Sequence, residues 1–168
     1  PEAFAALTSA PAKSREEFVQ QWIDGLRIWG SPAFADEARW GAMAEASYDR
    51  CFSPDGTARQ FYAIGASGHR GNDLPGVTTP TLVIHGSADT LITPSGGERT
   101  AALIPGARFE LIEGMGHDYP PQLWPQWVDL VAGFVIFSPP DHAVLVNDHF
   151  QWGSYVKSAN CRHPRRRT

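Results

Sequence analysis

The sequence predicts an α/β protein in which a helical segment precedes a parallel β-α-β unit and a last helix. Apolar residues recur at helical spacing through residues 1–75, residues 81–85 form an apolar run without polar alternation, and residues 108–112 form a second strand-like run. A strand without polar alternation is typical of a parallel sheet that is covered on both faces. Because strand, helix and strand follow one another closely, we expect parallel strands joined by a right-handed crossover.

The composition is that of a globular protein. The 168 residues are 42% hydrophobic and 19% charged, which suits about one domain. The longest apolar run, at residues 130–137, is far shorter than the roughly 20 residues that cross a bilayer, so no membrane partner is expected. We expect no secretory signal, and the two cysteines match neither a disulfide framework nor a metal-site spacing. A reducing compartment, the cytoplasm, is therefore the expected location.

The carboxyl-terminal residues differ from the rest in charge. The whole chain has a net charge of −4, but it ends in a basic segment at residues 162–167. Such a short basic end is usually solvated, so no nucleic-acid partner is expected. Residues 138–168 are left as an unassigned basic tail.

Three helices are expected within residues 1–75. Ser14 with Glu17 has the spacing of a capping box, and Gly30 suits the end of the helix that follows. Ser31 and the proline after it predict the start of a second helix. Residues 53–56 predict a turn. A third, shorter helix is expected after this turn, ending near residues 65–68. The aromatic residues of this segment suit either core packing, which is the commoner case, or a lid that lines an apolar pocket.

Past a Gly- and Pro-rich stretch at residues 71–76, the strands and helices alternate. Ser95 with Glu98 repeats the capping-box spacing and predicts a helix to about Ile104. Pro120 or Pro121 is expected to open a last helix that runs to about residue 137.

Two loops carry the residues that suggest chemistry. His85-Gly86-Ser87-Ala88-Asp89 follows the first strand, and Glu113-Gly114-Met115-Gly116-His117-Asp118 follows the second. Parallel strands deliver their following loops to the same edge of a sheet, so we expect Asp89 and His117 to be neighbours. In nucleophilic catalysis a carboxylate orients a histidine, which takes the proton of a serine or cysteine. Asp89 and His117 are therefore the candidate catalytic residues.

These runs resemble the carboxyl-terminal half of the α/β-hydrolase family, including its bacterial esterase-like members of the aclacinomycin-methylesterase type. The likeness covers roughly residues 1–137 and is carried by residues 79–89, 104–107 and 113–117. It implies a partial α/β-hydrolase core at residues 76–137, preceded by a helical lid at residues 1–75. It also implies that Asp89 is the triad acid, that His117 is the triad base, that the substrate is a small ester-like molecule, and that no cofactor is needed.

The family's nucleophile motif, Gly-x-Ser-x-Gly on a strand-to-helix elbow, does not occur in the sequence. Ser67 comes nearest, but a histidine replaces the final glycine and the residues before it are expected to be helical. Ser87 and Ser95 also lack the elbow context. The oxyanion hole is expected to be absent with the nucleophile, because one of its donors is the amide that follows the serine.

The small number of predicted strands also indicates that part of the fold lies outside this chain. Both strands are expected to lie in a sheet interior, yet two strands and a few helices cannot cover them. We therefore expect exposed apolar surface and a partner, the missing amino-terminal half of the same fold. In this interpretation the chain supplies the acid and base of a serine hydrolase acting on ester or related acyl bonds, and is inactive alone.

Several alternatives stay open. The chain could be a non-catalytic remnant that binds a partner, or part of a hydrolase with an aspartate nucleophile. A metal site at His85, Asp89, His117 and Asp118 is disfavoured, because the triad interpretation already uses two of these four. We expect the ring of His85 to hydrogen-bond locally. Asp118 suits either support of the His117 loop or exposure to water, and we favour exposure to water.

Overall fold

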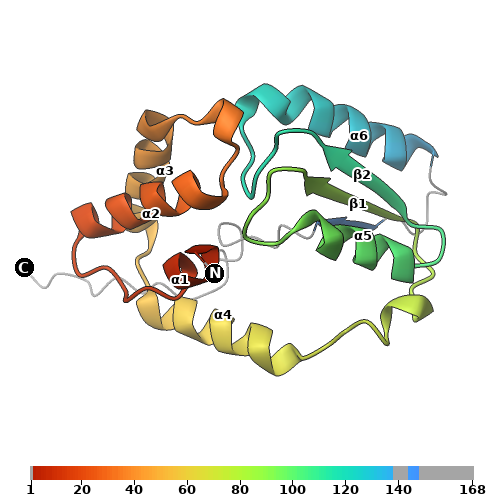
Figure 1. Cartoon of the computed structure of the whole chain (residues 1–168), viewed down its shortest axis with the longest axis horizontal. Coiled ribbons are helices and arrows are strands. Elements are labelled where there is room, and N and C mark those ends of the chain that lie inside the picture. The colour runs from red at the N-terminus through yellow and green to blue at the C-terminus, as the bar shows by residue number, and fades with distance from the viewer. Residues whose placement is uncertain (1, 138–143, 148–168) are drawn as a thin grey trace, which may run out of the picture.

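The computed structural model describes residues 2–137 and 144–147 of the chain (Figure 1). Its first part contains the helices α1 (Glu2–Leu7), α2 (Arg15–Trp29), α3 (Glu37–Arg50) and α4 (Pro54–Ser67). Its second part contains β1 (Thr81–Gly86), α5 (Pro94–Leu103), β2 (Arg108–Ile112), α6 (Trp124–Phe137) and β3 (Val144–Asn147). Short 3-10 turns lie at Pro32–Phe34, Leu74–Gly76 and Pro121–Leu123. The predicted fold class, a helical segment followed by a β-α-β unit and a helix, is confirmed.

The strands form a parallel sheet in the order β2-β1-β3. On one side of β1, Leu82 lies opposite Arg108 and Gly86 opposite Ile112. On the other side, the backbone of Thr81 lies opposite Val144. The parallel pairing of the first two strands is as predicted, whereas β3 was not expected, because it lies within the tail that sequence patterns left unassigned. The basic segment at the chain end lies outside the described residues.

The two predicted strands differ in burial. Every residue of β1 is buried, as its unbroken apolar run predicts. β2 is partly exposed, and the side chain of Leu111 is 43% exposed. The expectation that both strands lie in the sheet interior is therefore wrong for β2, which is an edge strand in the described sheet.

The sheet lies between α5 and α6 (Figure 1). One face carries a core of Leu82, Ile84, Ile112 and Met115, and α6 and the turn before it cover this core with Leu123, Trp127, Leu130, Val131 and Phe134. The other face carries His85 and Phe109, against which Gly97 of α5 packs. Alternate residues of β1 thus face opposite layers, as the pleat of a strand requires.

The start of α2 is capped as the sequence predicts. The Ser14 hydroxyl accepts a hydrogen bond from the amide of Glu17 at 3.1 Å. In a capping box, the carboxylate of Glu17 would accept in return from the amide of Ser14. Here it accepts instead from the amide of Lys13, one residue earlier. Gly30 follows the last residue of the helix and donates to Leu26 O.

Three other predicted helix starts are wrong by a few residues. The second helix, α3, begins at Glu37, where Asp36 caps it, and Ser31 precedes only a 3-10 turn. The predicted turn at residues 53–56 is the first turn of α4, which opens at Pro54. Likewise α5 opens at Pro94, so Ser95 is inside the helix. Proline suits the first helical position because it lacks the amide that would be unpaired there.

Helices α2 and α3 pack through aromatic and charged contacts. The ring of Phe18 lies 5.6 Å from that of Trp22 and 5.5 Å from that of Tyr48. Arg27 donates to Glu37 and so holds the pKa of that carboxyl below its ordinary value. Since the depressed pKa belongs to an acid, this contact is favourable at neutral pH and weakens as the pH falls.

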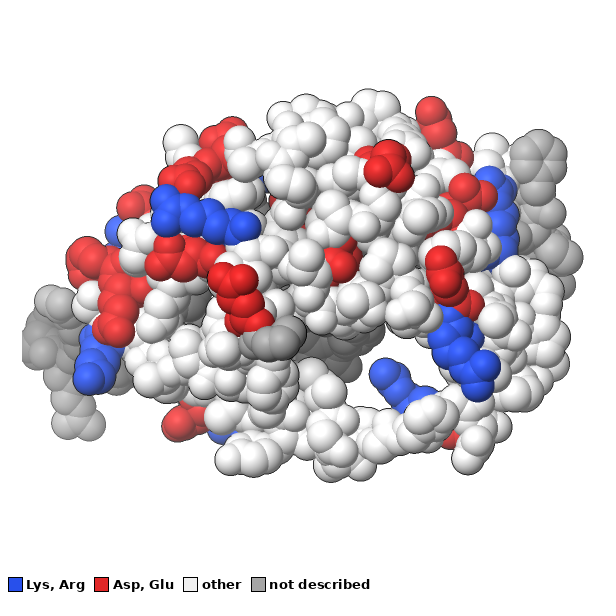
Figure 2. Space-filling model, viewed as in Figure 1, with Lys and Arg blue, Asp and Glu red and all other residues white. Residues whose placement is uncertain are grey.

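Apolar side chains remain exposed on the described surface, on helices as well as on β2. They include Tyr62 and Ile64 of α4, 76% and 65% exposed, and Val128 and Ile136 of α6, 63% and 74% exposed. Figure 2 shows an opening between α4 and the body of the molecule near α5. Among the described helices, none has the length and apolar character needed to span a membrane. The expected cytoplasmic location stays a prediction.

Replacing Gly97 by alanine is expected to destabilise the protein by about 1–3 kcal/mol. A Cβ at Gly97 would lie 2.7 Å from Nδ1 of the buried His85 ring, so α5 would have to move off the sheet. Gly133 of α6 is the matched control. A Cβ there meets nothing within 4 Å, so its alanine variant should gain about 0.5–1 kcal/mol of helix stability. Urea unfolding measures both, and a Gly97→Ala variant as stable as the parent would contradict the packing of α5 on β1.

Candidate active site

Asp89 lies in the loop after β1, with its carboxylate buried and hydrogen-bonded. The residue is 3% exposed. Its Oδ1 accepts hydrogen bonds from the amides of Leu91 and Ile92, both at 2.9 Å. A buried carboxylate is costly unless donors surround it, and these two amides hold it in one orientation.

The second oxygen of Asp89 meets His117. Oδ2 lies 2.8 Å from Nδ1 of the imidazole, although the two residues are 28 positions apart in the sequence. An ionised carboxylate only accepts, so Nδ1 carries the proton and the neutral ring has its lone pair on Nε2. The His117 side chain is 13% exposed and that of Asp89 is fully buried. The expectation that the two loops bring Asp89 and His117 together is confirmed.

Backbone contacts hold the two loops against each other. Ala88 donates its amide to Met115 O at 2.8 Å. The Ser87 hydroxyl accepts from the amide of Gly114 at 2.8 Å. Gly86 permits this approach, because a Cβ there would lie 2.2 Å from Met115 O.

His85 sits beneath this pair at the end of β1. Its ring is fully buried, and Nε2 lies 2.9 Å from Ile92 O and 3.5 Å from Asp89 Oδ2. The expected local hydrogen bond of His85 is confirmed, and the ring helps to enclose the acid. Within the described residues, no group of three or more His, Cys, Asp or Glu residues is arranged to hold a metal ion.

Asp118 does not simply face water, contrary to expectation. Its Oδ1 accepts from the amide of Ser31 at 2.8 Å and from the Ser31 hydroxyl at 2.5 Å. Ser31 is fully buried, and sequence reasoning missed this role because Ser31 and the proline after it suggested only a helix start. The partners are 87 positions apart, and no local pattern links them.

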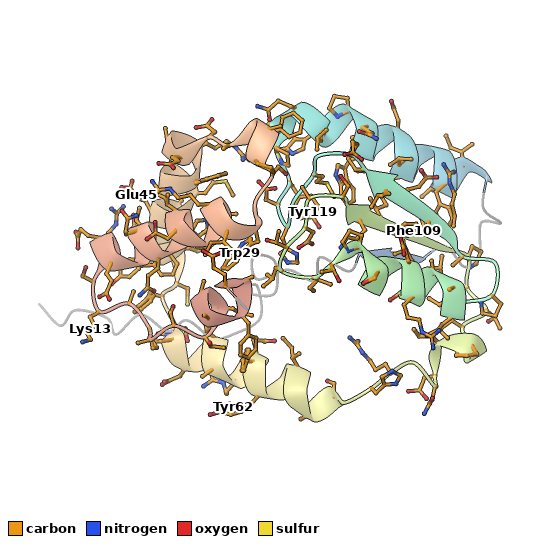
Figure 3. The ribbon with its side chains drawn as sticks, in the orientation of Figure 1. Lys13, Trp29, Glu45, Tyr62, Phe109 and Tyr119 are labelled. Atoms are coloured by element: carbon orange, nitrogen blue, oxygen red, sulfur yellow. The ribbon has the colours of Figure 1, made fainter. Side chains whose placement is uncertain are left out.

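Aromatic residues support the second loop from the α6 side. The Tyr119 ring lies 5.1 Å from that of Trp127, edge to face. Trp127 donates its indole N–H to the sulfur of Met115, and Trp124 donates to Tyr119 O. In Figure 3, Tyr119 and Trp29 lie at the junction between α2 and the sheet.

The serines weighed as nucleophiles have other partners. Ser67 lies in the last turn of α4, where its hydroxyl donates to Ala63 O. Ser87 pairs with Gly114, and the Ser95 hydroxyl lies 2.9 Å from that of Thr93. Ser67 does not follow a strand, so it lacks the strand-to-helix elbow that exposes the nucleophile of such enzymes.

Comparisons with known proteins identify similar chains. No protein-family model matches the sequence. The chain is 33% identical over 117 residues to the rhodomycin D methylesterase DnrP of Streptomyces peucetius and 31% identical to its counterpart DauP of Streptomyces sp. strain C5. Each match covers 68% of this chain and 39% of the relative. The chain thus spans well under half the length of these curated relatives.

Solved structures show the same fold. A meta-cleavage product hydrolase from Pseudomonas fluorescens IP01 superposes with a TM-score of 0.62 at 20% identity, over 80% of this chain and 50% of that one. An N-acyl homoserine lactone degrading enzyme superposes with a TM-score of 0.52 at 22% identity, over 80% and 51%. At these identities the likeness shows the fold alone. The resemblance to the α/β-hydrolase family is thereby confirmed, and the described residues form part of an α/β-hydrolase core with a helical segment before it.

Proposed function

We propose that this chain supplies the acid and the base of a serine hydrolase that acts on ester or related acyl bonds. Asp89 is the acid, His117 is the base, and the attacking serine belongs to a segment outside this chain. Residues 1–75 are the lid of that enzyme and residues 76–137 the carboxyl-terminal half of its core. The methylesterases and hydrolases that the chain resembles support the class of reaction.

The hydrogen bond between Asp89 and His117 is the observation that carries the proposal. The carboxylate keeps the proton on Nδ1, so Nε2 is the ring atom that accepts a proton from an attacking hydroxyl. When the ring becomes charged, the same carboxylate stabilises it, because the two groups are 2.8 Å apart and the acid is buried. The protonated ring then returns the proton to the leaving alkoxide as general acid.

The 168-residue chain alone is expected to be inactive towards p-nitrophenyl esters. Loss of the serine in a protease with the same triad logic costs about 10⁶ in turnover. The oxyanion donors are also expected to be outside this chain. The measurement compares the purified chain with its His117→Ala variant. Ester hydrolysis above background that disappears in this variant would mean that a nucleophile lies within the chain.

Supplying the upstream segment is expected to create an active enzyme. The coding DNA before Pro1 should encode a Gly-x-Ser-x-Gly motif, and co-expression of that segment should allow a fluorophosphonate probe to label its serine. In the assembled enzyme, Asp89→Asn is expected to lower kcat by about 10⁴. Thr100→Val of α5, which removes a hydroxyl contact with Gly96 O, is the control and should keep kcat unchanged. A well-folded assembly that the probe does not label would favour a non-catalytic remnant that binds a partner.

A further inference from the structure

The last residue of α2 and Ser31, two positions later, contact three consecutive residues of the loop that carries His117. The amide of His117 donates to Trp29 O at 2.6 Å. On one side of His117, the amide of Gly116 donates to the Ser31 hydroxyl at 2.8 Å. On the other side, the Asp118 carboxylate accepts two bonds from Ser31. The loop backbone is therefore fixed on both sides of the imidazole by the end of a helix in the amino-terminal segment.

The Ser31 hydroxyl links the two sides. It accepts from the amide of Gly116 and donates to Oδ1 of Asp118. A hydroxyl has only one proton to donate, so these two bonds set its direction. Because Ser31 is fully buried, water cannot readily replace the hydroxyl if it is removed.

The backbones of the helix end and the loop are also in close contact. A Cβ at Gly116 would lie 2.3 Å from the carbonyl carbon of Gly30 and 2.5 Å from Trp29 O. Thr90, next to Asp89, donates its hydroxyl to Ile28 O at 2.7 Å. One helix end thus reaches both loops of the candidate site.

The other contacts of the loop lie mainly before Gly116, where the Asp89 loop bonds Gly114 and Met115 and Trp127 bonds Met115. β2 ends at Ile112, five positions before His117, and Gly114 between them has a φ of 72°, which is open to glycine but strained for other residues. Met115 anchors the loop in the core below, whereas Gly116 and Asp118 are held by Ser31. The two residues that flank His117 are therefore held by Ser31, just after α2, while Asp89 holds the imidazole itself.

We propose that Ser31 and Asp118 are positioning residues that hold the His117 loop where Nδ1 meets Asp89. The consequence for catalysis rests on the proposed function. The contacts of Ser31 and Asp118 with the loop do not depend on it. Since Ser31 follows α2, a shift of that helix relative to the sheet would act directly on the residues that flank His117. The helical segment and the loop that carries His117 are therefore joined into one packed unit.

The test is the tautomer of the His117 ring in the full 168-residue chain. Long-range ¹⁵N–¹H spectra of the imidazole, recorded where the ring is neutral, report which nitrogen carries the proton. The parent should show the proton on Nδ1. Ser31→Ala and Asp118→Ala should each give a mixture with the Nε2 tautomer. Asp118→Asn keeps an oxygen that can accept from Ser31, so it should retain the parent spectrum, as should the remote control Thr100→Val.

Amide hydrogen exchange gives a second measurement on the same samples. Loss of one hydrogen bond at Ser31 should speed exchange of the Gly116 and His117 amides about five- to tenfold. Exchange in the core of β1 should stay unchanged. Urea unfolding identifies variants that fail to fold. If Ser31→Ala does not fold, Asp118→Ala, which changes a less buried residue, is used in its place. A folded variant of either residue with parent tautomer and parent exchange rates would overturn the proposal.

The outcome is separable from that of the proposed function. A shifted tautomer in Ser31→Ala supports the positioning role even if the assembled protein binds no fluorophosphonate. Conversely, an active assembly in which Ser31→Ala keeps the parent tautomer and kcat would retain the proposed function and reject the positioning role.

Discussion

The parallel pairing of β1 with β2 is the constraint on which the rest of the structure depends. Because the two strands run in the same direction, both following loops leave the sheet at one edge. An antiparallel pair would place Asp89 and His117 at opposite ends of the strands. Gly86 then allows the loops to touch, since any side chain at that position would collide with the backbone of Met115.

The acid and the base are held by different parts of the molecule. Asp89 depends on its own loop, whose amides at Leu91 and Ile92 surround one carboxylate oxygen. His117 depends on a distant segment, because Trp29 and Ser31 bind the residues around it. The acid is therefore oriented by its own loop, whereas the residues beside the base are held in addition by the end of α2, which also bonds Thr90 next to the acid.

Sequence patterns predict the features that depend on local order. The buried run of β1, the end of α2 before Gly30 and the two loops follow from apolar spacing and glycine placement, and the strand order then implies that Asp89 and His117 meet. The roles of Ser31 and Asp118 do not follow, because their contact spans 87 positions and exists only once α2 has docked. Helix starts were misplaced where proline opens a helix, as at Pro54 and Pro94, because the same residues also suit a turn or a serine cap.

The third strand also has a consequence for how the sheet can grow. A strand has two hydrogen-bonding edges, and in the described sheet β2 occupies one edge of β1 and β3 the other. A strand from elsewhere can therefore join β1 only by exchanging with residues 144–147, not by simple addition. The free edges of the described sheet are those of β2 and β3, and pairing with a separate molecule would begin there. The carboxyl-terminal strand thus separates β1 from any strand that would extend the sheet on that side, unless residues 144–147 are displaced.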